Sequence, residues 1–439
     1  MQQETDILSA PLPLTKVAKK GFWPGVFKQF KKNKLAVFSL WLILLLASIA
    51  ALADFIANEK PLIAKYNGQV YFPVFKSYVV ESGFANWPVE MQNIEWNSLQ
   101  YDWVVFPPIP YLPKNIDFAN AQSIGPFDDQ RVKSIHWRHW LGTDELGRDV
   151  MAGMIHGTRI ALLVGLISMS IASIIGILLG SLAGYFGDDK LKISRARIVL
   201  NPLFFLVAIF YAFGSRSYIL ADAINNSFAN FLFEFGISLI ILIAFMGVAN
   251  ILSHFLKAIP FFAVKINVAV DIIISRLIEV MVSIPTLFLI ISIIAIAKPS
   301  IFIVMAIIGF TSWTGIARFI RAELLRVRRL EYIEAAQALG FGEMRTIFKH
   351  AIPNALSPVL IAIAFGIATA ILIESTLSFL GIGLPAETMT WGSLLSSARQ
   401  STSAWWLAIF PGLAIFITVT IYNLVGEGLT DALDPRQKR

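Results

Sequence analysis

Long apolar runs alternate along this chain with polar, basic or Gly- and Pro-containing segments. Eight of the runs approach the roughly 20 residues that a helix needs to cross about 30 Å of hydrocarbon. Backbone polar groups in lipid must be satisfied within each segment, so the runs predict helices, and their length excludes a barrel of shorter strands. The predicted spans cover residues 35–53, 160–185, 198–213, 235–256, 278–297, 301–316, 355–373 and 405–425.

Composition supports the same class. Of the 439 residues, 56% are hydrophobic and 15% are charged, and the mean hydropathy is +0.68. Such a chain is too apolar for a single soluble core. It has no cysteine, which excludes disulfides and thiolate metal sites or nucleophiles. We therefore expect an all-α polytopic membrane protein whose folding rests on helix packing in lipid.

Basic residues predict the orientation of the spans, because loops rich in Lys and Arg stay in the cytoplasm. Lysines crowd the entry to the first span, from Lys16 to Lys34, and place the N-terminus inside. The net charge of +7 therefore indicates topology rather than nucleic-acid binding. Counting forward, the further inner basic residues are Lys190, Lys192, Arg195, Arg197, Lys257, Lys265, Arg318, Arg321, Arg326, Arg328, Arg329, Arg345, Lys349, Arg436, Lys438 and Arg439.

Three polar segments flank the spans. Residues 1–34 are a predicted cytoplasmic lead without the short apolar core and cleavage site of a signal peptide, and residues 428–439 are a predicted cytoplasmic tail. Segment 54–157 should be extracytoplasmic, and its prolines and tryptophans favour a small folded cap over a disordered tether. Two roles stay open for it: a surface that meets a delivery protein or closes the pore from outside, or a stabilising lid.

The polar gap between the sixth and seventh spans carries the most information. It reads EAAQALGFGEMRTIFKHAIPN over residues 334–354. Tyr332, Ala335, Ala336 and Leu339 recur at helical spacing and predict a small apolar face on which a partner can come close. Gly340 is placed to end that helix just after its C-cap.

A second short apolar face follows within the gap. Met344, Ile347 and Phe348 lead to Pro353, which suits the first turn of the next span. Pattern alone leaves two alternatives open for this helix pair. It is either a docking site for a partner in the aqueous phase or a pair of amphipathic helices that lie on the membrane without one.

The gap resembles the EAA loop of ABC importer permeases, whose pattern is roughly E-A-A, three residues, G, then I-F and a terminal P-N. The matching residues are Glu334, Ala335, Ala336, Gly340, Ile347, Phe348, His350, Pro353 and Asn354. Other stretches resemble the dipeptide and oligopeptide (DppC/OppC-like) branch, and the resemblance covers the first span and most of the chain from His139. These stretches are HWLGTDELGRDV at 139–150, GTRIAL at 157–162, LAGYFG at 182–187, ESTLSFLGIGL at 374–384 and the C-terminal part from Ala404 to Arg436.

The resemblance implies a type I ABC importer transmembrane fold in the bacterial plasma (inner) membrane, with both termini cytoplasmic. The implied partners are a homologous second permease subunit, two ABC ATPase subunits and an extracytoplasmic substrate-binding protein, besides membrane lipid. ATP-Mg would be bound by the ATPase subunits, and no phosphate loop of the form G-x-x-x-x-G-K-[ST] occurs here. We expect no cofactor, no metal and no catalytic residue in this chain.

The resemblance also assigns roles in the loop at 330–354. ATP-driven closure of the ATPases would pass through the EAA helices, with Glu334 and the Ala335–Ala336 face docking and Gly340 setting the bend. The implied coupling residues are Glu334, Ala335, Ala336, Leu339, Gly340, Ile347, Phe348, Pro353 and Asn354.

One departure from the family lies after the second span. In the family that span runs almost directly into a helix whose pattern resumes here at Asp271, Arg276, Glu279, Ser283 and Pro285. This chain instead inserts residues 190–265, which begin and end with basic residues and carry two apolar runs. We predict a helical hairpin that enters from the cytoplasm and returns to it. The predicted transmembrane domain, residues 158–427, contains this hairpin and five of the six spans of the family core. The sixth is the first span at 35–53.

Some polar residues lie within or beside spans. Glu374, with Ser375, is a candidate for lining the translocation pathway, because a charge in a span costs a few kcal/mol and usually faces protein or water; the alternative is a hydrogen bond between helices. Arg276 and Glu279 are spaced to form an ion pair. Thr143 and Asp144 are predicted to cap exposed amides and to seat the second span; the alternative for this segment is contact with the delivery protein. His136 and His139 lack the companions of a zinc site.

The function that these features favour is an ATP-driven importer permease for peptides or peptide-like compounds. An ion-gradient-driven secondary transporter or channel is the first alternative, although the chain has few of the buried charges expected of one. A non-transporting membrane scaffold is the second. Selectivity in such importers is set largely by the binding protein, so the sequence does not identify the substrate.

Overall fold

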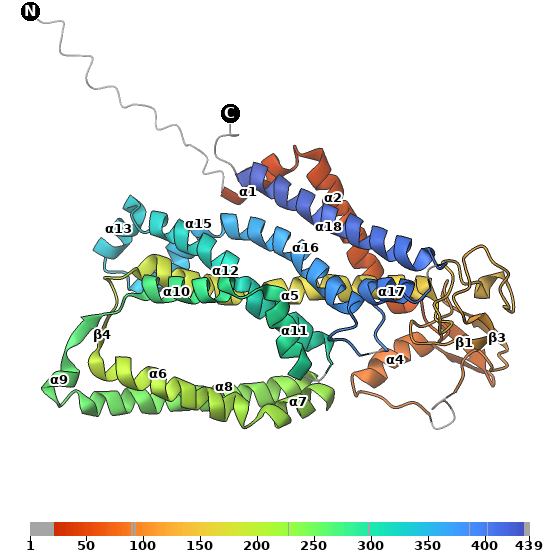
Figure 1. Cartoon of the computed structure of the whole chain (residues 1–439), viewed down its shortest axis with the longest axis horizontal. Helices are drawn as coiled ribbons and strands as arrows, with labels where there is room; N and C mark the ends of the chain where they lie inside the picture. Colours follow the sequence, from red (N-terminus) through yellow and green to blue (C-terminus); the bar gives the residue numbers. More distant parts are fainter. Residues whose placement is uncertain are drawn as a thin grey trace, which may run out of the picture. The chain divides into compact units, whose positions relative to one another are not determined.

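The computed structural model describes residues 22–88, 91, 94–226, 228–296, 299–385, 387–401 and 403–433. The predicted lead at 1–21 and the end of the tail at 434–439 lie outside them. The chain divides into two compact units, each described below by itself (Figure 1). The first combines Met1–Ile174, Pro285–Trp313 and Leu356–Arg439, and the second combines Ile175–Ile284 and Thr314–Ala355.

The described residues contain seven helical stretches that are long and apolar enough to cross a membrane. The pair α10 (Val270–Ser283) and α11 (Thr286–Ile296) adds an eighth if it is counted as one span. All eight correspond to predicted runs, so the helical multi-span class is confirmed. The seven are α2 (Lys34–Ala51), α5 (Val150–Phe186), α6 (Arg195–Ile209) with η4 (Phe210–Gly214), α8 (Phe228–Leu256), α12 (Ile301–Val327), α16 (Ser357–Phe379) and α18 (Trp406–Leu433).

The prediction of one unbroken helix over residues 278–297 is wrong. Ile284 leaves the helical conformation, with φ −90° and ψ 125°, and Pro285 follows it. A residue before proline disfavours the helical region, and proline has no N–H to donate to the preceding turn. Other helices, most of all α5 and α12, extend beyond the predicted spans, here 160–185 and 301–316, because hydropathy marks only the apolar part of a helix. Ala297 lies outside the described residues.

Small residues allow close helix packing in the first unit. Ser168 of α5 donates a hydrogen bond to the Met305 carbonyl of α12 at 2.9 Å. A Cβ on Gly309 would lie 2.7 Å from the Ser168 carbonyl oxygen, so the two backbones touch there, as small residues permit in membrane helices. Around this contact lies an apolar core that includes Ile290, Ile294, Val304, Ile308 and Leu377.

The C-terminal helix α18 organises the rest of the first unit. It packs along α16 and α2, and α17 (Trp391–Ala398) packs against both α16 and α18. The short N-terminal helix α1 (Phe22–Phe30) also contacts α18. A Cβ on Gly428 would lie 2.2 Å from the Cβ of Ala36, so α2 and α18 meet at a site that admits no side chain.

The segment predicted to be extracytoplasmic is folded in the residues described, and it contains the strands of the first unit. A three-stranded antiparallel sheet has the order β2-β1-β3, with Ala64 opposite both Tyr71 and Val104. The sequence did not predict the fold of this segment, and the sheet lies outside the spans for which helices were predicted. The elements are α3 (Ala53–Ile56), β1 (Ile63–Tyr66), β2 (Gln69–Tyr71), α4 (Pro73–Glu81), β3 (Trp103–Val105), η2 (Phe118–Asn120) and η3 (Ile135–Trp137).

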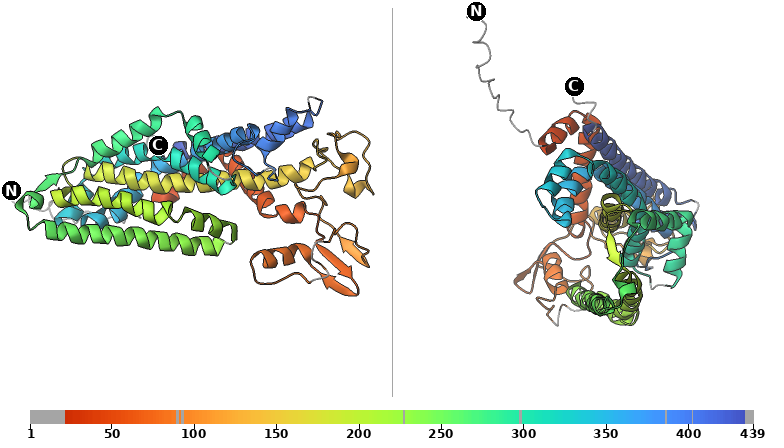
Figure 2. Two further views of the ribbon diagram at one scale, coloured as in Figure 1. Left: turned by 60° about the horizontal axis from the view of Figure 1, so that its bottom comes forward. Right: turned by 90° about the vertical axis from the view of Figure 1, so that its left-hand side faces the viewer.

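The second unit contains the inserted segment as a long helical hairpin. Strands β4 (Lys192–Ser194) and β5 (Lys265–Asn267) pair antiparallel and close its base. Helices α6 and α8 run side by side from this base, as both Figures 1 and 2 show. At the other end lies α7 (Ser217–Asn226), and α9 (Pro260–Ala263) lies just before β5. The chain therefore leaves the base and returns to it.

Small buried residues and one ion pair hold the hairpin together. Ala208, Ala212, Ser238, Ala249 and Ser253 are all 0% exposed, and small side chains at such positions let membrane helices approach closely. Near the far end, Arg216 pairs with Glu234 and donates a hydrogen bond to Ser238 at 3.2 Å. The hairpin thus carries its own packing contacts.

Candidate functional site

The loop at 330–354 lies in the second unit and begins with α13 (Glu331–Ala338). Its helix has a buried face formed by Ile333 and Ala336, which are 0% and 6% exposed. Glu334 and Ala335 are exposed on the other side. The sequence placed Ala335 and Ala336 on one docking face, and the structure separates them, because only Ala335 is accessible.

Gly340 ends this helix as predicted. Its φ is +79°, a left-handed conformation that glycine adopts without the steric cost of a Cβ. The Phe341 N–H donates to the Ala336 carbonyl at 3.1 Å, the long hydrogen bond of a Schellman motif. The chain therefore turns sharply between the two helices of the loop.

The second helix of the loop is one continuous run with a π-helical turn. It comprises α14 (Glu343–Thr346), η5 (Ile347–Ala351) and α15 (Ile352–Ala355), and the Ile352 N–H donates to the Ile347 carbonyl. Pro353 lies inside this run and not in the first turn of α16, which starts at Ser357. A wider turn accommodates a proline, because the missing N–H leaves a carbonyl of the preceding turn without its usual donor.

Exposed apolar side chains line both helices of the loop. Tyr332, Leu339, Met344 and Phe348 are 41%, 75%, 57% and 55% exposed. Together with exposed Ala335 they form what we name the coupling surface. Ile347, which the sequence grouped with Phe348, is instead buried at 4% exposure. Periodicity found the two helices but did not identify the inward side of each.

Contacts within the loop fix its shape. The rings of Phe341 and His350 stack at 6.1 Å, and the Arg345 guanidinium lies 4.8 Å from the Phe341 ring. Asn354 donates to the His350 carbonyl at 2.7 Å, and its side chain lies near the Tyr332 hydroxyl. The second helix thus approaches Tyr332 of the first. The coupling surface is preformed, which suits binding of a rigid partner.

Polar residues of α10, in the same unit as the loop, are also paired. Arg276 and Glu279 form the expected ion pair, with Nη1 2.6 Å from Oε2. Arg321 of α12 makes two hydrogen bonds to the Asp271 carboxylate. A cleft of about 500 Å³ lies between α10 and α12, and Ser275, Ser283 and Arg318 are among its lining residues.

Glu374 and Ser375 lie on α16 and are buried, at 1% and 5% exposure. Ser378 donates a hydrogen bond to Glu374 Oε1 at 2.6 Å, and Thr390, which precedes α17, lies beside this carboxylate. A Cβ on Gly392 would lie 2.4 Å from the Ser375 carbonyl oxygen. These contacts support the helix-to-helix alternative for Glu374. A role of the two residues in the pathway stays a prediction.

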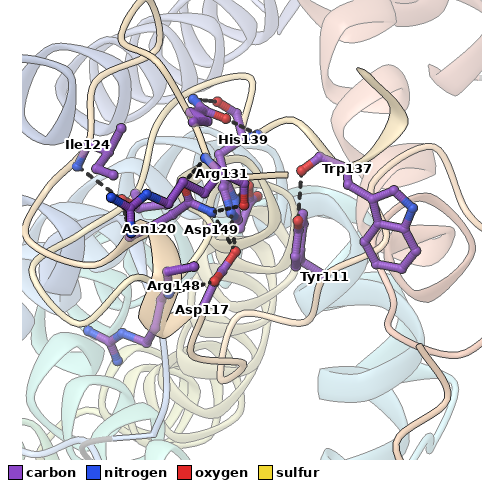
Figure 3. A network of polar contacts seen from close by, with 12 residues as sticks. Tyr111, Asp117, Asn120, Ile124, Arg131, Trp137, His139, Arg148 and Asp149 are labelled. Carbon is purple, nitrogen blue, oxygen red and sulfur yellow. Dashed lines mark hydrogen bonds and ion pairs between the residues drawn. The ribbon is translucent and has the colours of Figure 1, made fainter. Parts of the chain in front are cut away.

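A second polar site lies where the outer segment meets α5 (Figure 3). The His139 ring is buried, with Nδ1 2.8 Å from Asp149 Oδ2 and Nε2 3.2 Å from Asp117 Oδ2. Tyr111 stacks on it at 4.4 Å. Burial alone would lower the pKa of His139, but the hydrogen bonds and charges of Asp149 and Asp117 outweigh it and raise the pKa above its ordinary value.

This network seats α5 beneath the outer segment. Asp149 accepts from the Ala152 N–H at 2.6 Å and so caps the first turn of α5. Thr143 and Asp144 accept from the amides of Ile124 and Arg148, at 3.1 and 2.8 Å, so they order the loop and not the helix start. Among the residues that the structure describes, no group of three or more His, Cys, Asp or Glu could hold a metal.

Comparison with known proteins identifies the family. Residues 258–439 match the family described as binding-protein-dependent transport system inner membrane component. Residues 21–72 match the N-terminal TM domain of oligopeptide transport permease C. The di/tripeptide transport system permease protein DppC of Pseudomonas aeruginosa (strain UCBPP-PA14) is 30% identical over 302 residues, 69% of this chain and 73% of that protein. The chain belongs to this family of transport-system membrane components.

Two further relatives align with nearly the whole chain. The inner membrane ABC transporter permease protein YejE of Escherichia coli (strain K12) is 29% identical over 415 residues, 93% of this chain and 96% of that protein. The peptidoglycan transport system permease protein YejE of Agrobacterium fabrum (strain C58 / ATCC 33970) is 27% identical over 431 residues, 94% and 92% of the two chains.

Membership in this family decides between the alternatives that the sequence left open. The chain is a multi-pass inner-membrane permease subunit of an ABC importer, not an ion-gradient-driven transporter or a scaffold. The loop at 330–354 lies inside the region that matches this family, residues 258–439. The family match and the EAA resemblance therefore concern the same part of the chain.

Proposed function

We propose that this chain forms half of the translocation pathway of an ATP-driven importer of peptides or peptide-like compounds. Its partners would be a homologous second permease subunit, two ABC ATPase subunits and an extracytoplasmic binding protein. The names of the relatives support the substrate class, because they include a di/tripeptide, a dipeptide and a peptidoglycan transport system. ATP-Mg would bind the ATPase subunits, and this chain would be non-catalytic.

The observation that carries the proposal is the coupling surface. Leu339 and Phe348 are large apolar side chains that remain more than half exposed on a loop whose own shape is fixed by ring stacking and hydrogen bonds. Such side chains, presented on a rigid element, are typical anchors of a protein interface. Glu334 is exposed beside them and adds a charge for specificity.

Docking can be tested with Leu339→Asp and Phe348→Asp. Each change puts a charge on the apolar surface, so we expect ATPase association to weaken at least about tenfold, equal to about 1.4 kcal/mol. The measurement is the amount of ATPase subunit that co-purifies with the chain. Glu343→Gln, an exposed change on α14 outside the coupling surface, is the matched control. Full retention of the ATPases by both aspartate variants would contradict the docking role.

Transmission of force is tested separately with Glu334→Gln combined with Gly340→Ala. A Cβ at Gly340 meets nothing within 4 Å, so the alanine creates no clash with other residues. Its effect comes from the left-handed backbone conformation, which costs a residue with a Cβ about 1–2 kcal/mol of conformational free energy. We expect the assembled complex to insert normally but to lose substrate-stimulated ATPase activity. Normal stimulation in this variant would count heavily against coupling through this loop.

A further inference from the structure

The base of the inserted hairpin concentrates positive charge. We define the base as residues 190–197 and 257–267, where the chain enters and leaves the hairpin. It contains no acidic residue, and its net charge stays positive even when the adjacent Asp188 and Asp189 are counted. Its basic residues are Lys190, Lys192, Arg195, Arg197, Lys257 and Lys265.

Within the part of the chain that the structure describes, these cations have no acidic partner. Among the described residues, none of the six forms an ion pair. Lys190 lies over the ring of Tyr185 at 4.8 Å, and Arg195 lies over the ring of Phe261 at 4.7 Å. At the far end of the hairpin the basic residue Arg216 is instead neutralised by Glu234. In the described part of the hairpin, uncompensated positive charge therefore lies at the base.

The base is amphipathic as well as basic. In the β4–β5 ribbon Lys192 faces Asn267, Ser194 faces Lys265, and Ile193 faces Ile266. Residues that lie opposite each other in an antiparallel pair share a face of the ribbon. One face is thus polar and cationic, and the other is aliphatic. Phe261 of α9, 61% exposed, adds an aromatic side chain beside the ribbon.

The length of the hairpin places this base at a membrane surface. Arg195–Gly214 is a 20-residue stretch, and a helix of about that length spans the hydrocarbon core. Large apolar residues on α6 and α8, such as Leu206, Ile240 and Ile243, are more than 60% exposed and suit lipid chains. Strand β4 leads directly into α6, and α9 and then β5 follow α8 (Figure 1), so a membrane-spanning hairpin would hold the ribbon at the level of the lipid headgroups.

We propose that the base of the hairpin is a binding site for anionic phospholipid headgroups. Exposed Lys192, Arg197 and Lys265 would contact the phosphates, while the aliphatic face of the ribbon and Phe261 lie among the upper acyl chains. Basic clusters at the membrane surface bind anionic lipids through such contacts, and aromatic rings prefer the interface. A lipid is favoured over an acidic protein, because headgroups are always present at this depth. This inference needs only that the hairpin spans the membrane, and it is independent of the peptide substrate.

The test compares the full complex, as isolated from its membrane, with the same complex carrying Lys192→Gln, Arg197→Gln and Lys265→Gln. Retained phospholipid is counted by native mass spectrometry after equilibration with phosphatidylglycerol or phosphatidylcholine. We expect the triple variant to bind phosphatidylglycerol at least about fivefold more weakly, the effect expected of even one surface charge, with phosphatidylcholine unchanged. The matched control removes three basic residues from the outer segment: Lys114→Gln, Arg131→Gln and Lys133→Gln.

A measurement on the unaltered complex keeps the test decisive even if the triple variant fails to fold. Its preference for phosphatidylglycerol over phosphatidylcholine should fall as salt rises, because ions screen surface charge. Free inorganic phosphate at millimolar concentration should not displace the lipid, since it lacks the acyl chains. Equal retention of the two lipids by the unaltered complex would overturn the proposal. So would equal phosphatidylglycerol retention by the triple variant and the control.

Discussion

Glu374 carries a buried carboxylate within a span, and its partners define what each substitution should do. Ser378 donates a hydrogen bond to it, and the Thr390 side chain lies beside it. Glu374→Ala would leave these buried hydroxyls without that partner, so we expect a loss of about 1–3 kcal/mol in stability. Glu374→Gln keeps an acceptor oxygen at the same place and should retain most of that stability. The thermal unfolding midpoint of the purified complex measures both.

The same pair of variants separates structure from transport. If Glu374 acts as a contact between α16 and α17, peptide uptake by the glutamine variant should match that of the unaltered complex. Normal stability together with a large loss of uptake would instead assign Glu374 to the pathway. That result would contradict the structural role that the hydrogen bonds indicate.

His139 makes the junction of the outer segment with α5 sensitive to pH. The groups that face it are Asp149, Asp117 and the Tyr111 ring. Its pKa in the folded protein lies above the ordinary value of about 6.5. The stabilisation is therefore fully present below about pH 6.5 and is lost as pH rises through the raised folded pKa.

His139→Gln should remove this dependence, because glutamine does not titrate. We expect the variant to be less stable below neutral pH by about 1.5–3 kcal/mol, the range for hydrogen bonds to charged groups, and to differ less from the unaltered protein in alkali. Limited proteolysis of the outer segment across pH 6–9 reports the effect locally. A constant difference at every pH would show that the imidazolium does not contribute.

At the scale of elements, the contact of α16 with α17 depends on one glycine. A Cβ on Gly392 would lie 2.4 Å from the Ser375 carbonyl oxygen and 2.8 Å from the Ser375 Cα, and neither backbone atom moves easily. Gly392→Ala should therefore destabilise the unit by about 1–3 kcal/mol or more. Gly412→Ala in α18 is the control, since its Cβ meets nothing within 4 Å. Equal unfolding midpoints for the two variants would contradict the packing.

Sequence patterns identified elements better than they identified faces and junctions. The spans were predictable because an apolar run of the right length has one stable form in lipid. The break at Pro285 was missed because hydropathy does not register a missing N–H. Ala336 and Ile347 were assigned to exposed faces because the 3.6-residue period gives the width of an apolar face and not its direction. Those faces are set by tertiary contacts.

The outer network could not be predicted from local pattern. His139 contacts Asp117 and Asp149, and Asn120 joins the same network through Asp117 at 2.8 Å. These residues come from two loops and a helix start. An isolated His and scattered acidic residues have no spacing that signals such a contact. The one available signal was Asp149 just before an apolar helix, which is a capping pattern.

For the whole molecule, the number of membrane crossings in the hairpin, even or odd, determines on which side of the membrane the coupling loop lies. The hairpin begins and ends at one ribbon, so its removal takes away two crossings and should leave all later loops on their original side. Replacing residues 195–264 with Asn-Gly would join β4 to β5 through the tight turn that antiparallel strands favour. We expect the shortened chain to insert with its coupling loop still in the cytoplasm.

Single cysteines test this orientation, because the chain has none of its own. Lys349→Cys marks the coupling loop, and Lys114→Cys marks the outer segment. On intact cells a membrane-impermeant thiol reagent should label only the second, and permeabilisation should expose the first, in both the full-length and the shortened chain. Labelling of Lys349→Cys on intact cells in the full-length chain would show that the topology is the reverse of the predicted one. The coupling surface would then lie outside, where the ATPases cannot reach it. Labelling in the shortened chain alone would mean that the inserted segment crosses the membrane an odd number of times.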